Sequence, residues 1–389
     1  MTKFTTRCLI VVCTLLAFSC KKEDEPSTES LEKEVVSNYA AIVYASYEDS
    51  YNTAVTLQQK INAFVAAPSA AGLEECKAAW KAARIPYGQT EAYRFYGGPI
   101  DDANGPEGLI NSWPLDEVYI DYVKDMPDAG IINNIKIEIT KAKLDSLNQA
   151  GGDTDEQSEV NVATGYHAIE FLLWGQDFNA NGPGDRPYTD YVTGGTAKNQ
   201  ARRGQYLKVI AELLVEDLAY VKDLWAEDGA YRKKFTSQMT VKTALSDVFT
   251  GLSELSNDEL AGERMLVAIS EEDPTKRQEH EHSCFSDNTH IDIQMNFKGV
   301  KNVYYGTYTR VDGTVVKGRS IAEVLEKQDK ERASALDATF TTTETKILAI
   351  PAPFDQAIIN NVDKIQAAAA SLKTLSEELL DGAFALGIN

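Results

Sequence analysis

The sequence predicts an all-α protein with two helical halves, and two observations lead to this prediction. Apolar residues recur at three- and four-residue spacing along most of the chain, which is the period of an amphipathic helix. Clusters of Gly, Pro, Asn and Asp separate these periodic segments and mark loops. The strand signal is confined to 308–316, where Asp312-Gly313 stands between two β-rich runs. Such a dipeptide predicts a small β-hairpin, which would decorate the second half.

The first half is expected to cover residues 31–196. Val35, Tyr39 and Ile42 begin a long apolar stripe, and Pro68 ends it because proline cannot continue a helix. A Gly/Pro-rich loop follows the second helix. The expected segments, in order, are helices at 35–67, 71–96, 115–126 and 129–149, a loop at 97–114, and a further helix beginning near Val160.

The second half is expected to cover residues 197–389. It follows a loop at 175–195 that is rich in Gly, Asp and Asn. Helical periodicity returns near 206–224 and 241–255. The last helix has the clearest apolar stripe, typical of a bundle helix, formed by Ile358, Val362, Ile365, Ala369, Leu372 and Leu379.

The first 30 residues are typical of an export signal rather than of the folded protein. Lys3 and Arg7 precede an apolar run at 9–18, which is too short to span a bilayer. Ala17-Phe18-Ser19-Cys20 resembles a lipoprotein cleavage site, so we expect residues 1–19 to be a signal peptide and Cys20 to carry a lipid. A simple secretory signal is the alternative. Residues 20–30 would then form a polar tether.

Localisation and partners follow from this segment and from the net charge. Lys21-Lys22-Glu23-Asp24-Glu25 resembles a signal for the outer face of the outer membrane. We therefore expect a lipid-anchored protein at the cell surface; the periplasmic face and an ordinary solvated linker are the alternatives. The net charge of −21 repels phosphate backbones, which argues against nucleic acid as a partner. Cys76 and Cys284 are expected to be buried thiols.

One short motif in the first half could carry chemistry. Gly165, His167 and Glu170 form a GxHxxE pattern, and in a helix the imidazole and the carboxylate would share one face. Such a pair suits a metal ion, or a base held by a carboxylate. An ordinary core or surface pair is the alternative. The HExxH motif of zinc peptidases is absent.

Two further groups of residues could line a site. Three of the four histidines lie at 280–290, where His282, Ser283, Asp287 and His290 form either the wall of a site or a polar loop that caps the next helix. On the second helix, polar side chains recur at three- and four-residue steps. These side chains belong to Arg84, Tyr87, Glu91 and Arg94. They form either a stripe of exposed ion pairs or the buried wall of a site.

Together these segments resemble the imelysin-like family, and more closely its iron-regulated protein A branch. TGYHAIEFLLWGQD carries the GxHxxE motif whole. Five other blocks occur in the family's order: WKAARIPY at 80–87, WPLDE at 113–117, NGPGDRPYTDY at 181–191, GERM at 262–265 and EHSCFSDNTH at 281–290.

The resemblance implies two helical bundles that face each other, with the GxHxxE motif at a cleft between them. It further implies a metal ion: iron, or zinc if the protein is a peptidase. We therefore expect an anchored lipoprotein that binds a metal or an iron-related ligand during iron acquisition, with iron-uptake partners. A metallopeptidase and a non-catalytic adhesion or scaffold protein are the alternatives. Enzymatic activity is left open.

A geometric expectation follows from the positions of the histidines. His167 and Glu170 supply only two ligating groups, and the remaining histidines lie in the second half. We expect His282 or His290 to approach His167 within roughly 10–12 Å, so that one small ligand could touch both halves. Gly165 would allow a neighbouring segment to approach the motif closely, since it has no side chain.

Overall fold

The computed structural model describes residues 27–149, 160–179 and 182–388. Over these residues loops connect the helices, and the extended structure consists of one antiparallel sheet of two strands, β1 (Thr307–Thr309) and β2 (Val315–Lys317), and an isolated bridge between Val123 and Met126. This confirms the all-α prediction and the predicted hairpin. The expected signal peptide at 1–19 and Cys20 lie outside the described residues. Among the described helices, none combines the length and apolarity needed to cross a bilayer.

Up to residue 225 the described chain forms three long helices and several shorter helical segments. The long helices are α1 (Thr28–Ala66), α2 (Ala70–Thr90) and α9 (Gln200–Trp225). The shorter elements are η1 (Glu91–Tyr93), α3 (Glu107–Ile110), α4 (Glu117–Ile120), α5 (Gly130–Asn133), α6 (Lys141–Leu147), α8 (Gly165–Trp174) and η2 (Tyr188–Tyr191).

The remaining elements follow α9 along the chain. They are α10 (Ala230–Lys233), η3 (Lys234–Gln238), α11 (Val241–Glu254), η4 (Leu255–Leu266), α12 (Val267–Ser270), η5 (Pro274–His280), α13 (Thr289–Tyr304), α14 (Ile321–Gln328), α15 (Lys330–Leu348), α16 (Phe354–Asn360) and α17 (Val362–Ala385). The segments η3 and η4 are π-helical, and η4 continues α11 directly.

Helix ends differ from expectation where local chemistry starts or stops a helix. The first helix begins at Thr28, inside the expected tether, because the Ser27 hydroxyl accepts a hydrogen bond from the Ser30 N–H. The two helices expected at 115–126 and 129–149 are replaced by the short turns α4, α5 and α6. Gly130 has a φ of +84°, which a continuous helix does not allow.

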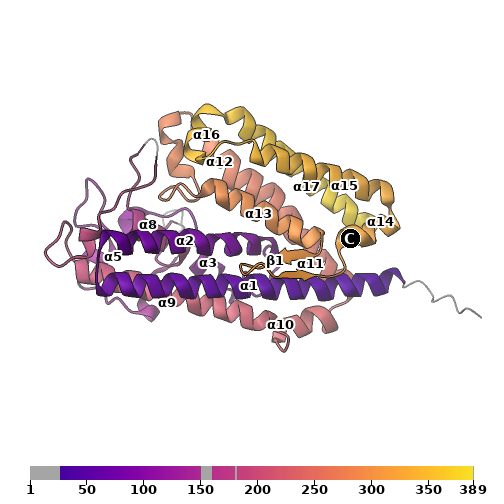
Figure 1. Cartoon of the computed structure of the whole chain (residues 1–389), viewed down its shortest axis with the longest axis horizontal. Coiled ribbons are helices and arrows are strands. Elements are labelled where there is room, and N and C mark those ends of the chain that lie inside the picture. The colour runs from indigo at the N-terminus through magenta and orange to yellow at the C-terminus, as the bar shows by residue number, and fades with distance from the viewer. Residues whose placement is uncertain (1–26, 150–159, 180–181, 389) are drawn as a thin grey trace, which may run out of the picture.

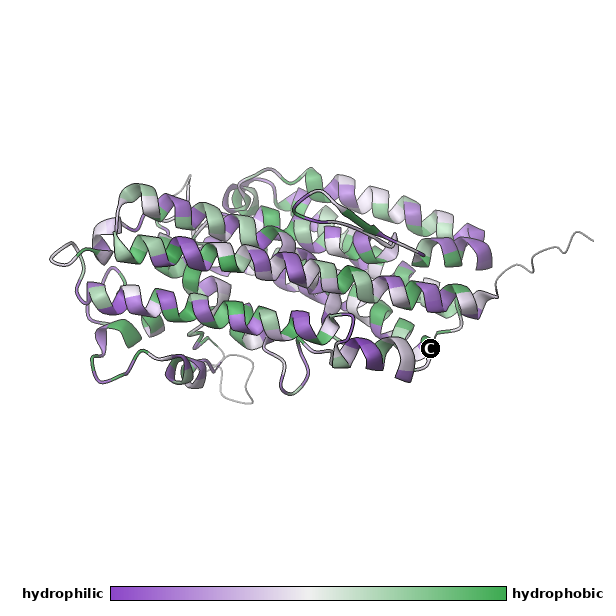
Figure 2. Cartoon of the chain, turned by 60° about the horizontal axis from the view of Figure 1, so that its bottom comes forward, coloured by the Kyte–Doolittle hydropathy of each residue, from purple (hydrophilic) through white to green (hydrophobic). Residues whose placement is uncertain are grey.

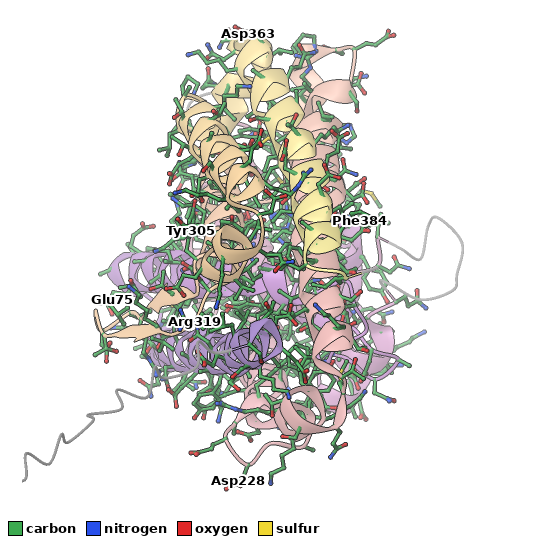
Figure 3. The ribbon with its side chains drawn as sticks, turned by 90° about the vertical axis from the view of Figure 1, so that its right-hand side faces the viewer. Glu75, Asp228, Tyr305, Arg319, Asp363 and Phe384 are labelled. Atoms are coloured by element: carbon green, nitrogen blue, oxygen red, sulfur yellow. The ribbon has the colours of Figure 1, made fainter. Side chains whose placement is uncertain are left out.

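The helices form two layers that meet along α2 and α13. In Figure 1, α1, α2 and α9 run side by side, and α13, α15 and α17 lie across α2 from α1. Hydropathy alternates around the helices in Figure 2, as expected where one stripe faces the core. Figure 3 looks along the long axis of the molecule, with Asp363 at the top and Asp228 at the bottom.

The candidate site residues His167, Glu170 and His282 are buried in the interior of the protein. The cysteines Cys76 and Cys284 are both buried and unpaired, as expected. The expected domain division near residue 196 falls between η2 and α9, and it stays a prediction.

Candidate functional site

The GxHxxE motif forms the first two turns of the buried helix α8. Gly165 begins this helix with a φ of +84°, a conformation that L side chains rarely adopt. A Cβ at this position would lie 2.5 Å from the Ile110 carbonyl oxygen on α3. The structure thus confirms that a neighbouring segment approaches the motif closely. It also explains why α8 begins at Gly165 and not near Val160.

His167 meets His282 from the second half. Their Nε2 atoms lie 3.1 Å apart, and their ring centroids are separated by 4.4 Å. Both side chains are at most 1% exposed. The expected approach of a second-half histidine is therefore confirmed, and the residue that provides it is His282.

A carboxyl group lies behind each imidazole. Nδ1 of His167 is 3.0 Å from Oε2 of Glu170, and Nδ1 of His282 is 3.1 Å from Oδ2 of Asp292. The other oxygen of Glu170 accepts hydrogen bonds from the backbone N–H and the hydroxyl of Ser286. The two histidines are thus held from outside, with their Nε2 atoms turned toward each other.

The charge of Asp292 determines the order of protons along this chain of groups. Burial opposes its ionisation, yet Arg84 and His282 hold the pKa of Asp292 below its ordinary value. Its carboxylate therefore accepts a hydrogen bond from Nδ1–H of His282. Burial lowers the pKa of His282 to about 3 and also lowers that of His167, so each ring carries one proton.

The remaining protons follow from this assignment. Nε2 of His282 carries a lone pair, so Nε2–H of His167 donates to it. Nδ1 of His167 then accepts, and its donor must be a protonated Glu170. Burial raises the pKa of Glu170 to about 8, which agrees with a protonated carboxyl group at neutral pH.

Arg84 connects this series of hydrogen-bonded groups to the polar residues of α2 that the sequence analysis identified. Its Nε donates to Asp292 over 3.1 Å, and its terminal nitrogen donates to the Asn111 side chain over 2.5 Å. The Asn111 amide in turn donates to Glu91 over 3.2 Å. Arg84 and Glu91 are both buried, which supports the buried wall over the exposed stripe.

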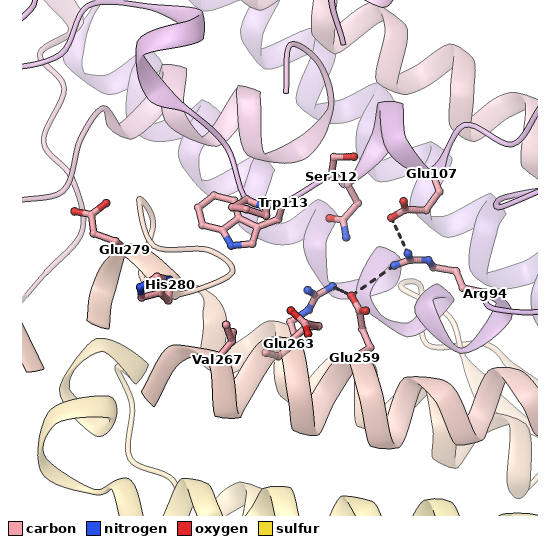
Figure 4. A pocket seen from close by; sticks show the side chains of 12 residues that line it. Arg94, Glu107, Ser112, Trp113, Glu259, Glu263, Val267, Glu279 and His280 are labelled. Atoms are coloured by element: carbon pink, nitrogen blue, oxygen red, sulfur yellow. Dashed lines mark ion pairs between the residues drawn. The ribbon is translucent and has the colours of Figure 1, made fainter. Parts of the chain in front are cut away.

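Trp113 covers the histidine pair on one side. Its ring centroid lies 5.1 Å from that of His167 and 6.4 Å from that of His282. Beyond Trp113 lies an open cavity of about 420 Å³, shown in Figure 4. It is lined by Arg94, Glu107, Asn111, Ser112, Trp113, Pro114, Glu259, Glu263, Arg264, Val267, Glu279 and His280.

The other site residues predicted at 280–290 do not all lie at the histidine pair. Ser283 is part of the site, since its hydroxyl donates to Asp292 over 2.5 Å. Asp287 has a φ of +53° and interacts electrostatically with Asp177 and Asp355. No hydrogen bond or ring contact joins Asp287 or His290 to His167 within the part of the chain that the structure describes.

Sequence reasoning missed three residues that complete the arrangement: Asp292, Ser286 and Trp113. Asp292 lies in the first turn of α13, where an acidic residue is ordinarily explained by the helix dipole. Among the described residues, no group of three or more His, Cys, Asp or Glu side chains is arranged to hold a metal ion. The atoms at this site that face each other and could bind a metal ion are the Nε2 nitrogens of His167 and His282.

Comparisons with family models and with known proteins find the following matches. A family model described as Imelysin matches residues 43–380. Iron-regulated protein A of Synechococcus elongatus is 27% identical over 355 residues, which cover 87% of this chain and 83% of that protein.

Two crystal structures share the fold. One, described as a candidate iron-regulated protein A precursor of Parabacteroides distasonis, has a TM-score of 0.72 and 20% identity, covering 94% of this chain and 97% of that one. The other is an imelysin-like protein of Psychrobacter arcticum, with a TM-score of 0.63 and 14% identity, covering 94% and 98%.

Proposed function

The chain belongs to the imelysin family, and we propose that it binds a metal ion between the Nε2 atoms of His167 and His282 as part of iron acquisition. The observation that carries this proposal is the separation of 3.1 Å between those two nitrogens. Two imidazole nitrogens that each lie about 2.0–2.1 Å from one ion would be separated by this distance at an angle of about 100°. That angle lies between those of square and tetrahedral coordination.

The carboxyl groups behind the rings support the same proposal. Histidines that bind metals ordinarily donate their other ring N–H to a carboxylate or a carbonyl group, which fixes the ring and its tautomer. Glu170 and Asp292 stand in that position here. Since both Glu170 oxygens already have partners, we assign Glu170 the role of orienting His167. Direct ligation by Glu170, as the sequence suggested, stays a prediction.

Calorimetric titration of the purified chain with iron(II), copper(II) and zinc(II) tests the proposal. We expect one ion per chain with micromolar or tighter affinity, and a loss of binding in His167→Ala and in His282→Ala. His280→Ala is the matched control, because His280 is exposed and outside the pair. Failure to bind any of the three metals, or equal affinity in His167→Ala, would rule the proposal out.

The peptidase alternative is tested in the same preparation. Catalytic zinc sites have three protein ligands and a water molecule, whereas the histidine pair provides two nitrogens. Metal binding requires no third protein ligand, so we prefer it. Cleavage of a peptide library that a chelator abolishes would favour the peptidase.

We also propose that the protein is anchored in the outer membrane through a lipid on Cys20. The support is the sequence around Ala17–Cys20 and the acidic segment after it. The name of the Synechococcus relative supports a link to iron supply. Radiolabelled palmitate should label the wild-type protein and not Cys20→Ala, and expression should rise under iron limitation.

A further inference from the structure

The cavity beyond Trp113 has the size of a small organic ligand and is separate from the histidine pair. Its volume of about 420 Å³ lies within the range of roughly 300–1,000 Å³ that is usual for small-molecule sites. Neither His167 nor His282 lines it. Trp113 stands between the two sites, because it lines the cavity and also packs against both imidazole rings.

The arginines of the cavity are already neutralised by carboxylates. Arg94 lies 2.7 Å from Glu91 and 3.2 Å from Glu107, and Arg264 lies 2.5 Å from Glu259 and 3.6 Å from Glu91. Three carboxylates thus surround two guanidinium groups. This end of the cavity offers no excess positive charge to an anionic ligand.

Each of these arginines nevertheless keeps one unused donor. The Nε atoms of Arg94 and Arg264 are buried and have no hydrogen-bond partner among the described residues. The Arg264 side chain is only 5% exposed. A buried N–H without an acceptor is unfavourable. Because the surrounding charge is negative, a neutral oxygen is the acceptor that suits these donors.

The rest of the cavity favours a cation. Glu263 and Glu279 line it and are exposed, and within the described ranges no ion pair involves either of them. In Figure 4, Glu279 and His280 lie at one end of the cavity and Arg94 and Glu107 at the other, with Trp113 between them. The face of a tryptophan attracts ammonium and guanidinium groups.

We propose that this cavity binds an organic cation that also carries a neutral oxygen acceptor. Its ammonium or guanidinium group lies near Glu279 and the Trp113 ring, its carbonyl or hydroxyl oxygen faces Arg94 and Arg264, and Glu263 adds negative charge to the wall. This site is additional to the proposed metal site and does not depend on it, because no histidine of the pair contributes to its wall.

Three related probes test the proposal by calorimetry on the purified chain. Argininamide carries the cation and a neutral carbonyl, agmatine lacks the carbonyl, and arginine replaces it with a carboxylate. We expect argininamide to bind, and the other two to bind at least about fivefold more weakly. Binding of arginine as tight as that of argininamide, or no binding of argininamide at millimolar concentration, would overturn the proposal.

Charge-removing variants localise the site. Glu263→Gln combined with Glu279→Gln should weaken argininamide binding about tenfold, since each exposed charge pair contributes a factor of roughly two to five. Glu377→Gln on α17 is the matched control, because it is exposed and lies outside the cavity. Unchanged affinity in the double variant would contradict the proposal.

A final comparison separates the two sites. His167→Ala should abolish metal binding and leave argininamide binding intact, while the double glutamine variant should weaken argininamide binding and leave metal binding intact. Thermal unfolding curves show whether each variant is folded. Loss of argininamide binding in a folded His167→Ala protein would show that the cavity is not an independent site, and would overturn the inference.

Discussion

The Nε2 atoms of His167 and His282 are 3.1 Å apart although 115 residues separate the two histidines in the sequence. Glu170 and Asp292 hold the rings from outside, so that neither ring can turn without breaking a buried hydrogen bond. In the metal-free protein one proton lies between the two nitrogens. A metal ion in the same place requires that both nitrogens present lone pairs.

The first prediction concerns the pH dependence of metal binding. For Nε2 of His167 to become a lone pair, its ring proton must move to Nδ1, and Glu170 must lose its proton to accept from that Nδ1–H. The pKa of Glu170 is raised to about 8 by burial. Metal affinity should therefore rise with pH, by up to about tenfold per unit below pH 8, and level off above it.

Calorimetry in two buffers of different ionisation enthalpy measures this directly. About one proton should be released per metal ion at pH 6.5, and fewer above pH 8. An affinity that stays constant between pH 6 and 8 would contradict the protonation order deduced for the site.

The second prediction uses Glu170→Gln to separate folding from binding. The glutamine amide N–H₂ can donate to Nδ1 of His167, as the protonated carboxyl group does, while its oxygen still accepts from Ser286. The variant should fold normally. It should bind metal at least about tenfold more weakly at pH 8, because His167 is held with its proton on Nε2.

Glu377→Gln serves again as the control, because it makes the same change at an exposed position. Wild-type metal affinity in Glu170→Gln would show that Glu170 does not set the tautomer of His167.

The sequence predicted the motif helix correctly because its signals are local. His167 and Glu170 share a face through helical spacing alone, and Gly165 indicated a close approach. The choice of His282 over His290 could not be predicted, because it depends on how the loop before α13 folds. In that loop Asp287 adopts a positive φ, which its sequence neighbours do not specify.

Asp292 was missed for a related reason. Its position in the first turn of α13 has an ordinary explanation as a helix-start residue, and only long-range packing brings Arg84 to it from α2. Similarly, the sequence shows that Trp113 belongs to the WPLDE segment at 113–117. It does not show that Trp113 lies between the histidine pair and the neighbouring cavity. Local periodicity predicts elements, whereas the partners of buried polar groups depend on tertiary packing.

The third prediction compares two glycines that have almost the same backbone conformation. Gly165 and Gly313 have φ values of +84° and +85°. A Cβ at Gly165 would clash with the backbone of Ile110, whereas a Cβ at Gly313, at the hairpin tip, has nothing within 4 Å. Gly313→Ala should cost about 1 kcal/mol through φ alone. Gly165→Ala should cost more, about 3 kcal/mol or above, since the backbone must also shift.

Urea unfolding of the two variants measures the difference. The Gly165 variant should also bind metal more weakly, because any shift of α8 moves His167 away from His282. Equal destabilisation by the two substitutions would show that the contact between α8 and α3 relaxes at no cost.

The last prediction concerns Asp217, a carboxyl group on α9 far from the site in sequence. One of its oxygens is buried without a hydrogen-bond partner among the described residues. Burial, with Asp145 and Glu216 nearby, raises its pKa to about 7. The folded state therefore binds this proton more tightly than the unfolded state, in which the pKa is near 3.9. Stability from this group is present below pH 4 and is lost as pH rises to about 7.

Asp217→Asn removes the charge that forms over this range. The variant should unfold at a higher temperature than the wild type at pH 8. Its advantage should shrink toward pH 4, where the wild-type carboxyl group is protonated in the folded state and about half protonated in the unfolded state. Asp223→Asn on the same helix is the control, because Asp223 is exposed and its replacement should change the unfolding temperature little at either pH. Thermal scans at pH 4.5, 6 and 8 decide the matter. A variant less stable than the wild type at pH 8 would mean that the ionised Asp217 has a stabilising partner.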